Sequence, residues 1–214
     1  DSGPPVFDKV LRWVNFANEL TGNSLPPPKI QSLKKQLSKS SAKNSLIIIQ
    51  PFSAVREKEC PPEVYKYIID RIPNTIKVMI TGTKDDLNRH PEFNILFNRE
   101  NTEFNGSAFS DLVEMIQSAE LLISVDTAMM HLSVALGTAT LCLASAAYVN
   151  EIVPYAEATS PPNAHFYYIP MECQSCLGKC IKKLENNMYP CVAQLNPNVI
   201  LKKDCNILNL KCIA

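Results

Sequence analysis

The sequence predicts an α/β fold with a Rossmann-like parallel sheet that carries helices on both faces. Short apolar segments without alternation recur between residues 46 and 145, which is typical of strands buried on both sides. Segments with helical spacing of apolar residues separate them, so strand and helix alternate along the chain. The 214 residues, of which 46% are hydrophobic, suffice for one large domain or for one domain plus an appendage.

The N-terminal region is predicted to form one helix followed by a linker. Residues 6–20 place their apolar side chains on one helical face, and Gly22 and Asn23 end the helix. Residues 25–45 contain three prolines, five lysines and no acid, which indicates a linker. Its lysines are expected either to be solvated or to face an anionic membrane surface.

The remaining elements follow in order along the chain. Strands are predicted at residues 46–49, 76–82, 121–125 and 139–145. Helices are predicted at residues 63–72, 93–98, 107–119 and 129–136, with a loop at 83–93 and one or two short helices within 196–210. The region after Tyr148 is expected to be irregular.

Composition narrows the classes of function. The 21 basic and 21 acidic residues give a net charge of zero, which argues against a nucleic-acid partner. No apolar run approaches the roughly 20 residues that span a bilayer. With eight cysteines and no secretory signal pattern, we expect reduced thiols and a cytoplasmic location.

Three polar residues interrupt the apolar stretch of residues 123–145. Asp126 and Thr127 stand between a predicted strand and helix, and His131 lies about one turn into that helix. Ligands of parallel sheets bind beyond the carboxyl ends of the strands, and the first amides of the helix favour an anion such as phosphate. Alternatively, Asp126 or Thr127 is a plain N-cap and His131 a core residue.

These residues resemble a known family. The sequence Asp126-Thr127-Ala128-Met129-Met130-His131-Leu132 is similar to the Asp-Thr-Gly-x-x-His-Leu pattern of glycosyltransferase family 9, the lipopolysaccharide heptosyltransferases and their relatives. The match lies in the C-terminal, donor-binding domain of that family. Ala128 stands where the family usually has Gly, so its methyl group bears on how closely the backbone approaches a diphosphate.

Further segments extend the resemblance and imply donor-binding roles. Ser53 and Lys58 fall where the family places a hydroxyl residue and a lysine on the donor diphosphate. Asp85 or Asp86 matches the acid that binds the donor ribose, and the sequence does not choose between them. Ser107, after Gly106, matches the loop along the base pocket.

A cysteine cluster also has counterparts in the family. It consists of Cys173, Cys176, Cys180 and Cys191. Free thiols and a zinc or iron–sulfur site are both open readings, and no metal is expected from the family. The neighbouring lysines form a basic patch, which either meets an anionic sugar acceptor or faces solvent: Lys179, Lys182 and Lys183.

The resemblance implies one half of a GT-B fold. Residues 1–44 are then the connecting helix and linker from a missing N-terminal acceptor domain. Residues 45–214 are the nucleotide-sugar-binding domain, with a Cys-rich segment at 173–191 and C-terminal helices. The general base of this family lies in the N-terminal domain, so no catalytic residue is expected in this chain.

The expected function is the donor-binding half of an inverting glycosyltransferase. It would transfer heptose or another sugar from a nucleoside-diphosphate sugar to a lipopolysaccharide or similar glycan acceptor without a metal or other cofactor. An ADP-heptose-like donor is the first candidate. Peripheral association with the cytoplasmic face of the inner membrane fits such an acceptor. The alternatives are a nucleotide-sugar epimerase-like enzyme of the same fold and a degenerate, non-catalytic interaction or metal-binding module.

Overall fold

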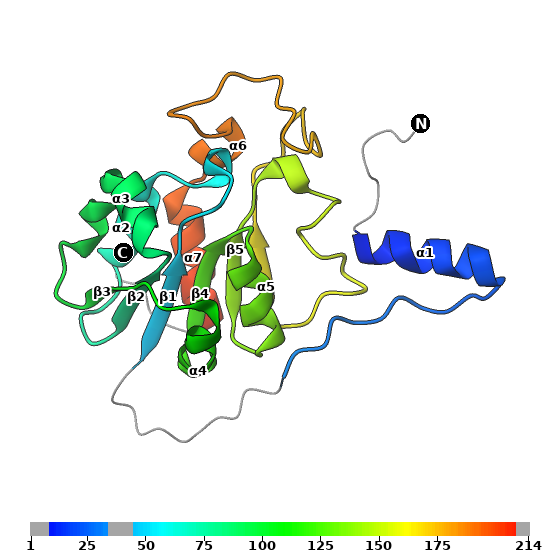
Figure 1. Cartoon of the computed structure of the whole chain (residues 1–214), viewed down its shortest axis with the longest axis horizontal. Helices are drawn as coiled ribbons and strands as arrows, with labels where there is room; N and C mark the ends of the chain where they lie inside the picture. Colours follow the sequence, from blue (N-terminus) through cyan, green and yellow to red (C-terminus); the bar gives the residue numbers. More distant parts are fainter. Residues whose placement is uncertain (1–8, 34–44, 209–214) are drawn as a thin grey trace.

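A parallel β-sheet forms the centre of the structure, a computed structural model that describes residues 9–33 and 45–208 (Figure 1). Its strands are β1 (Leu46–Gln50), β2 (Lys77–Thr81), β3 (Thr102–Asn105), β4 (Leu121–Val125), β5 (Thr140–Leu143) and β6 (Ala164–Tyr167). In the described part of the chain they pair in the order β3-β2-β1-β4-β5-β6, and every neighbouring pair is parallel. The predicted fold class is confirmed.

Helices cover both faces of the sheet. The α-helices are α1 (Lys9–Thr21), α2 (Pro62–Ile69), α3 (Lys84–Arg89), α4 (Val113–Ser118), α5 (Ala128–Ala135), α6 (Pro190–Ala193) and α7 (Pro197–Leu208). The 3-10 helices are η1 (Arg56–Lys58), η2 (Pro91–Phe97), η3 (Phe109–Leu112) and η4 (Ala146–Tyr148). α4 and α5 lie on one face, and α7 crosses behind β4 on the other (Figure 1).

Burial on two faces explains why the central strands show no alternation. Ile47 and Ile49 of β1 pack into one core cluster together with Tyr65 of α2. Ile48, between them, packs into a second cluster with Ile116 of α4. Every position of β4 is buried, so both faces of these strands select apolar residues.

Sequence patterns missed the two edge strands. β3 and β6 are short, and most of their side chains are only partly buried, so they lack the continuous apolar signal of the centre. The expectation of an irregular region after Tyr148 is therefore wrong at residues 164–167.

The helical predictions need two corrections. The predicted loop at 83–93 contains α3, a polar helix that begins with a reciprocal capping box between Thr83 and Asp86. The single helix predicted at 107–119 is instead η3 followed by the shorter α4. Residues 93–98 lie within and just beyond η2, which is a 3-10 helix.

The predicted N-terminal helix is confirmed from residue 9 on as α1, which buries none of its residues, while residues 6–8 lie outside the described residues. An ion pair between Arg12 and Glu151 connects it to the domain, and Figure 1 shows it beside rather than on the sheet. Part of the predicted linker lies outside the described residues, including Lys34, Lys35, Lys39 and Lys43. The C-terminal end of the chain also lies outside them, including residues 209–210 of the predicted C-terminal helices and Cys212. None of the described helices has the length and apolarity needed to cross a membrane.

Candidate functional site

The centre of the sheet brings two loops together. β1 and β4 are neighbours, and Gln50 at the end of β1 is in register with Ser124 of β4. The chain proceeds from β1 to β2 and β3 on one side, and from β4 to β5 and β6 on the other. The strand order therefore reverses between β1 and β4, and ligands of open α/β sheets bind beyond the carboxyl ends at such a point.

Lys58 and Asp126 meet at this position. Lys58 ends η1, Asp126 follows β4, and the Lys58 Nζ donates to Asp126 Oδ2 over 3.1 Å. The side chains are only 10% and 3% exposed. The ammonium also lies 4.6 Å from the centre of the Tyr148 ring, which adds a cation–π contact. The predicted residues thus form a buried charge pair, and their role in donor binding stays a prediction.

The start of α5 lies directly beside this pair. Thr127 occupies the N-cap position in an extended conformation, but its side chain makes no capping hydrogen bond. Its Oγ1 lies 3.2 Å from Ser124 Oγ instead. Ala128, the first helical residue, is exposed. The alternative of a simple capping side chain therefore fits neither Thr127 nor Asp126, whose carboxylate is paired with Lys58.

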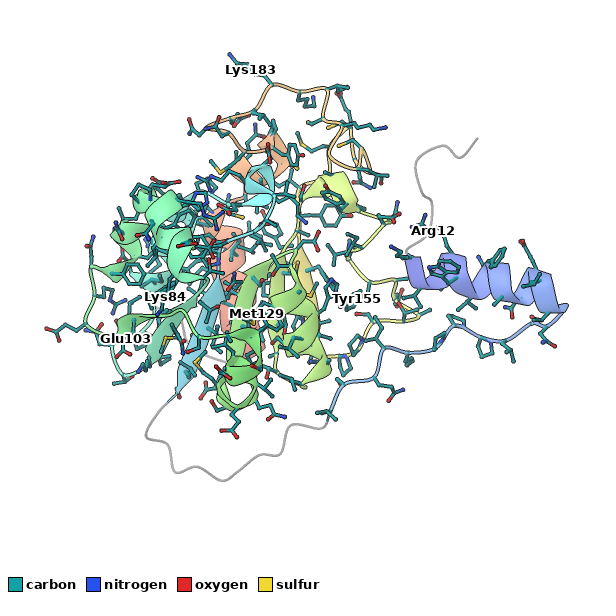
Figure 2. The ribbon with its side chains drawn as sticks, in the orientation of Figure 1. Arg12, Lys84, Glu103, Met129, Tyr155 and Lys183 are labelled. Carbon is teal, nitrogen blue, oxygen red and sulfur yellow. The ribbon has the colours of Figure 1, made fainter. Side chains whose placement is uncertain are left out.

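His131 is held by a residue from a distant segment. Its Nδ1 lies 2.5 Å from the hydroxyl of Tyr155, and Figure 2 shows Tyr155 beside α5. Burial lowers the pKa of His131, while the charges of Asp126 and Lys58 act on it in opposite directions. A neutral imidazole at neutral pH follows, which acts through a hydrogen bond rather than as a cation.

The loop that carries Ser53 contains two residues that sequence reasoning missed. The Ser53 amide donates to Glu59 Oε1 over 2.8 Å, and Arg56 pairs with the other oxygen of this carboxylate. Glu59 is fully buried, and burial raises its pKa. Ser53 Oγ accepts from the Val55 amide over 3.2 Å. Glu59 therefore holds the loop that positions Lys58, although a glutamate in a polar loop gives no sequence signal of burial.

The structure separates the two candidate ribose acids. Asp86 Oδ2 accepts from the Thr83 amide over 2.6 Å, and Asp86 Oδ1 accepts from Arg89 over 3.1 Å. Asp85 is exposed in the first turn of α3. The carboxylate of Asp86 is thus used to cap its helix, whereas Asp85 is exposed.

Ser107 follows β3, and Asp85 follows β2, the neighbouring strand of the sheet. Thr81, at the end of β2, is in register with Asn105 of β3, and the Ser107 amide donates to Asn105 Oδ1 over 2.9 Å. The following loops touch, since a Cβ built on Gly106 would meet Lys84 Cγ at 3.2 Å. The predicted residues therefore form two groups at neighbouring strand ends: Ser53, Lys58, Asp126, Thr127, Ala128 and His131 in one, and Asp85, Asp86 and Ser107 in the other.

Phe52 joins the two groups. It follows β1, is only 2% exposed, and its ring fills the space in front of Gly82. A Cβ at Gly82 would lie 2.6 Å from this ring, so the close approach of the two loops depends on glycine at that position.

The cysteine cluster does not form a metal centre in the described part of the chain. Cys173, Cys176 and Cys180 are partly buried free thiols, and the buried Cys191 lies 3.4 Å from Ser145 Oγ. Among the described residues, no group of three or more His, Cys, Asp or Glu side chains is arranged to hold a metal ion.

A comparison with protein families matches this chain to a known family. The model of glycosyltransferase family 9 (heptosyltransferase) matches residues 6–180, which is most of the chain. A search of curated proteins finds no match.

Solved structures share the fold at low sequence identity. E. coli ADP-heptose LPS heptosyltransferase II is 18% identical with a TM-score of 0.59, and 87% of this chain covers 55% of that chain. The family 9 glycosyltransferase from Veillonella parvula DSM 2008 is 16% identical with a TM-score of 0.63, at 98% and 62% coverage. E. coli heptosyltransferase WaaC with ADP is 14% identical with a TM-score of 0.53, at 88% and 52% coverage. The chain thus spans little more than half the length of these proteins.

Proposed function

Because this chain belongs to glycosyltransferase family 9, we propose that it is the donor-binding half of an inverting glycosyltransferase. The donor would be a nucleoside-diphosphate sugar, with ADP-heptose the first candidate, since similar folds were solved as an ADP-heptose transferase and with ADP. The transferred sugar would be heptose or a related hexose.

The buried pair of Lys58 and Asp126 at the reversal of strand order carries the proposal. The Lys58 side chain is only 10% exposed, so it has lost most of its hydration, and a buried cation depends on negatively charged partners for its stability. An arriving diphosphate supplies two further negative groups beside Lys58. The ammonium then shares its donors between Asp126 and a phosphate oxygen.

The other residues of this group would stabilise the negative charge on the leaving diphosphate. The Thr127 hydroxyl makes no capping hydrogen bond, so it can donate to a phosphate oxygen. The first amides of α5 add their partial positive charge. The neutral His131 contributes a hydrogen bond. Such fixed donors act most strongly on charge that develops during bond cleavage, so they assist departure of the nucleoside diphosphate.

Asp85 and Ser107 are proposed to contact the nucleoside. A carboxylate accepts from ribose hydroxyls, as in dinucleotide-binding folds. The general base and the acceptor site, for a lipopolysaccharide or similar glycan, would belong to an acceptor domain, and no residue of this chain is assigned that role. We place the reaction at the cytoplasmic face of a membrane that presents the acceptor, with no metal required.

Titration calorimetry of the whole chain with ADP and with UDP tests this function. We expect ADP to bind in the presence of EDTA and to compete with an ADP-sugar. Folding is checked by circular dichroism in the same sample. A folded chain that binds neither nucleotide contradicts the proposal and would favour a degenerate, non-catalytic module.

A further inference from the structure

The segment between β6 and α6 exposes apolar and basic side chains together. Its outer part, residues 177–184, is called the 177–184 loop below. Leu177, Ile181 and Leu184 are 44%, 86% and 38% exposed, and Ile181 is the most exposed large apolar side chain of the described residues. Lys179 and Lys183 are also exposed. Figure 2 shows Lys183 at the outer end of this segment, pointing away from the domain.

The base of the loop is firmly attached. The Leu177 amide donates to the carbonyl of Ala147 over 2.8 Å, and the hydroxyl of Tyr189 donates to the carbonyl of Gly178 over 3.3 Å. On the other side, Gln194 next to α6 donates to Glu185 Oε1 over 2.6 Å, and Glu185 and Met188 form an antiparallel bridge. Both ends are therefore held while the tip projects, which is how a domain presents a preformed contact surface.

Charge on the loop is net positive. Lys182 pairs with Glu172 over 3.3 Å, and Glu185 accepts a hydrogen bond from Gln194 over 2.6 Å. Lys179 and Lys183 have no ion-pair partner among residues 9–33 and 45–208. Two free cations thus flank an isoleucine that is almost fully exposed to water.

We propose that the 177–184 loop inserts shallowly into the surface of an anionic phospholipid bilayer. A soluble anionic glycan would pair with the lysines but would leave Leu177, Ile181 and Leu184 in water. At a bilayer interface the apolar side chains reach the acyl region, while lysines bind the negatively charged headgroups.

The 177–184 loop lies close to the proposed donor site. The Tyr189 amide donates to the carbonyl of Glu57, next to Lys58, over 2.8 Å. A Cβ on Gly178 would meet the hydroxyl of Tyr148, and the ring of Tyr148 lies beneath the Lys58 ammonium. Figure 1 shows the loop above the end of the sheet where these residues lie. This interpretation rests on the proposed function: docking would hold the donor site near a lipid-linked acceptor.

Helix α1 is the second candidate for the membrane contact, because it also exposes large apolar side chains. Trp13 and Phe16 are 63% and 56% exposed beside a surface hollow that Lys9, Arg12 and Glu151 also line. Both cations of this hollow lie within ion-pair distance of Glu151. Their charge is therefore partly neutralised, which favours the 177–184 loop as the membrane contact.

Co-sedimentation of the full chain with vesicles tests the proposal. Vesicles of phosphatidylglycerol and phosphatidylethanolamine are compared with vesicles of phosphatidylcholine at low and high salt, without nucleotide. Wild type should bind the anionic vesicles, and high salt should weaken this binding. The variant Lys179→Ala/Lys183→Ala should lower partitioning roughly 30-fold at low salt. The variant Ile181→Ser/Leu184→Ser should lower it by about tenfold or more at either salt concentration.

The matched control is Trp13→Ser/Phe16→Ser on α1, which should bind as wild type. The proposal is overturned if wild type does not bind anionic vesicles, if both loop variants bind as wild type, or if only the α1 variant loses binding. ADP calorimetry on the same variants separates the two proposals. Loop variants should keep wild-type ADP affinity, and vesicle binding without ADP binding would remove only the proposed donor function.

Discussion

Lys58 Nζ lies 3.1 Å from Asp126 Oδ2, across the point where the strand order of the sheet reverses. The two residues are 68 positions apart in sequence, and neither side chain is more than 10% exposed. A change in such a buried pair should alter both the stability of the domain and the positive charge that an anionic ligand meets.

Lys58→Ala should therefore affect both stability and binding. Without the ammonium, Asp126 is left buried and unpaired, and unfolding free energy should fall by about 3 kcal/mol. ADP affinity should fall roughly 10- to 100-fold through loss of a charge-assisted hydrogen bond. Urea denaturation and calorimetry measure the two effects.

The double variant Lys58→Ala/Asp126→Asn is the control for this change. It removes the unpaired charge, so it should recover part of the stability but none of the ADP affinity. If the double variant binds ADP as wild type does, Lys58 does not contact the diphosphate.

Ala128→Gly should strengthen ADP binding. The methyl group is exposed at the start of α5, where a phosphate would approach the backbone amides. Glycine also lowers helix stability, by up to about 1 kcal/mol. The control is Ala135→Gly, at the exposed end of the same helix. It should lower helix stability in the same way without raising ADP affinity. Equal ADP affinity in all three proteins would show that the backbone does not approach the ligand here.

Asp86→Ala should lower the stability of the domain, whereas Asp85→Ala should weaken ADP binding. Asp86→Ala removes the capping box of α3 and should lower unfolding free energy by about 1 kcal/mol. Asp85→Ala should leave stability unchanged but weaken ADP binding roughly tenfold. Pyrophosphate, which has no ribose, should bind the Asp85→Ala variant as it binds wild type. A loss of pyrophosphate affinity would argue against a ribose contact.

The contribution of His131 to the stability of the domain should decline as pH falls below about 6.5. Burial lowers the pKa of His131 from its ordinary value of 6.5. Between the lowered value and 6.5 the unfolded chain binds more protons than the folded one, so acid favours unfolding. The contribution is complete above pH 6.5 and is lost as pH falls through this window.

His131→Gln should reduce the slope of unfolding free energy between pH 7 and pH 5, as followed by urea denaturation at several pH values. His165, whose pKa burial also lowers, supplies part of the same slope. The double variant His131→Gln/His165→Gln should therefore show a smaller slope than either single variant. An unchanged slope in His131→Gln would mean that its imidazole is equally easy to protonate in both states.

Local patterns were sufficient for the central architecture. Continuous apolar segments such as residues 46–49 and 121–125 predicted buried strands, because a strand covered on both faces selects apolar side chains at every position. The same reasoning failed for β3 and β6, whose side chains are mostly half-exposed at the sheet edges. It also failed for α3, which forms through a cap rather than an apolar face.

The sequence by itself determined the α/β class and the loops that carry polar groups after strands. Which partners those groups find was decided by the tertiary structure, because register and burial are properties of segments far apart in the chain. Register placed Lys58 against Asp126. Burial made Glu59 a support of the Ser53 loop, and helix capping occupied Asp86 while leaving Asp85 exposed.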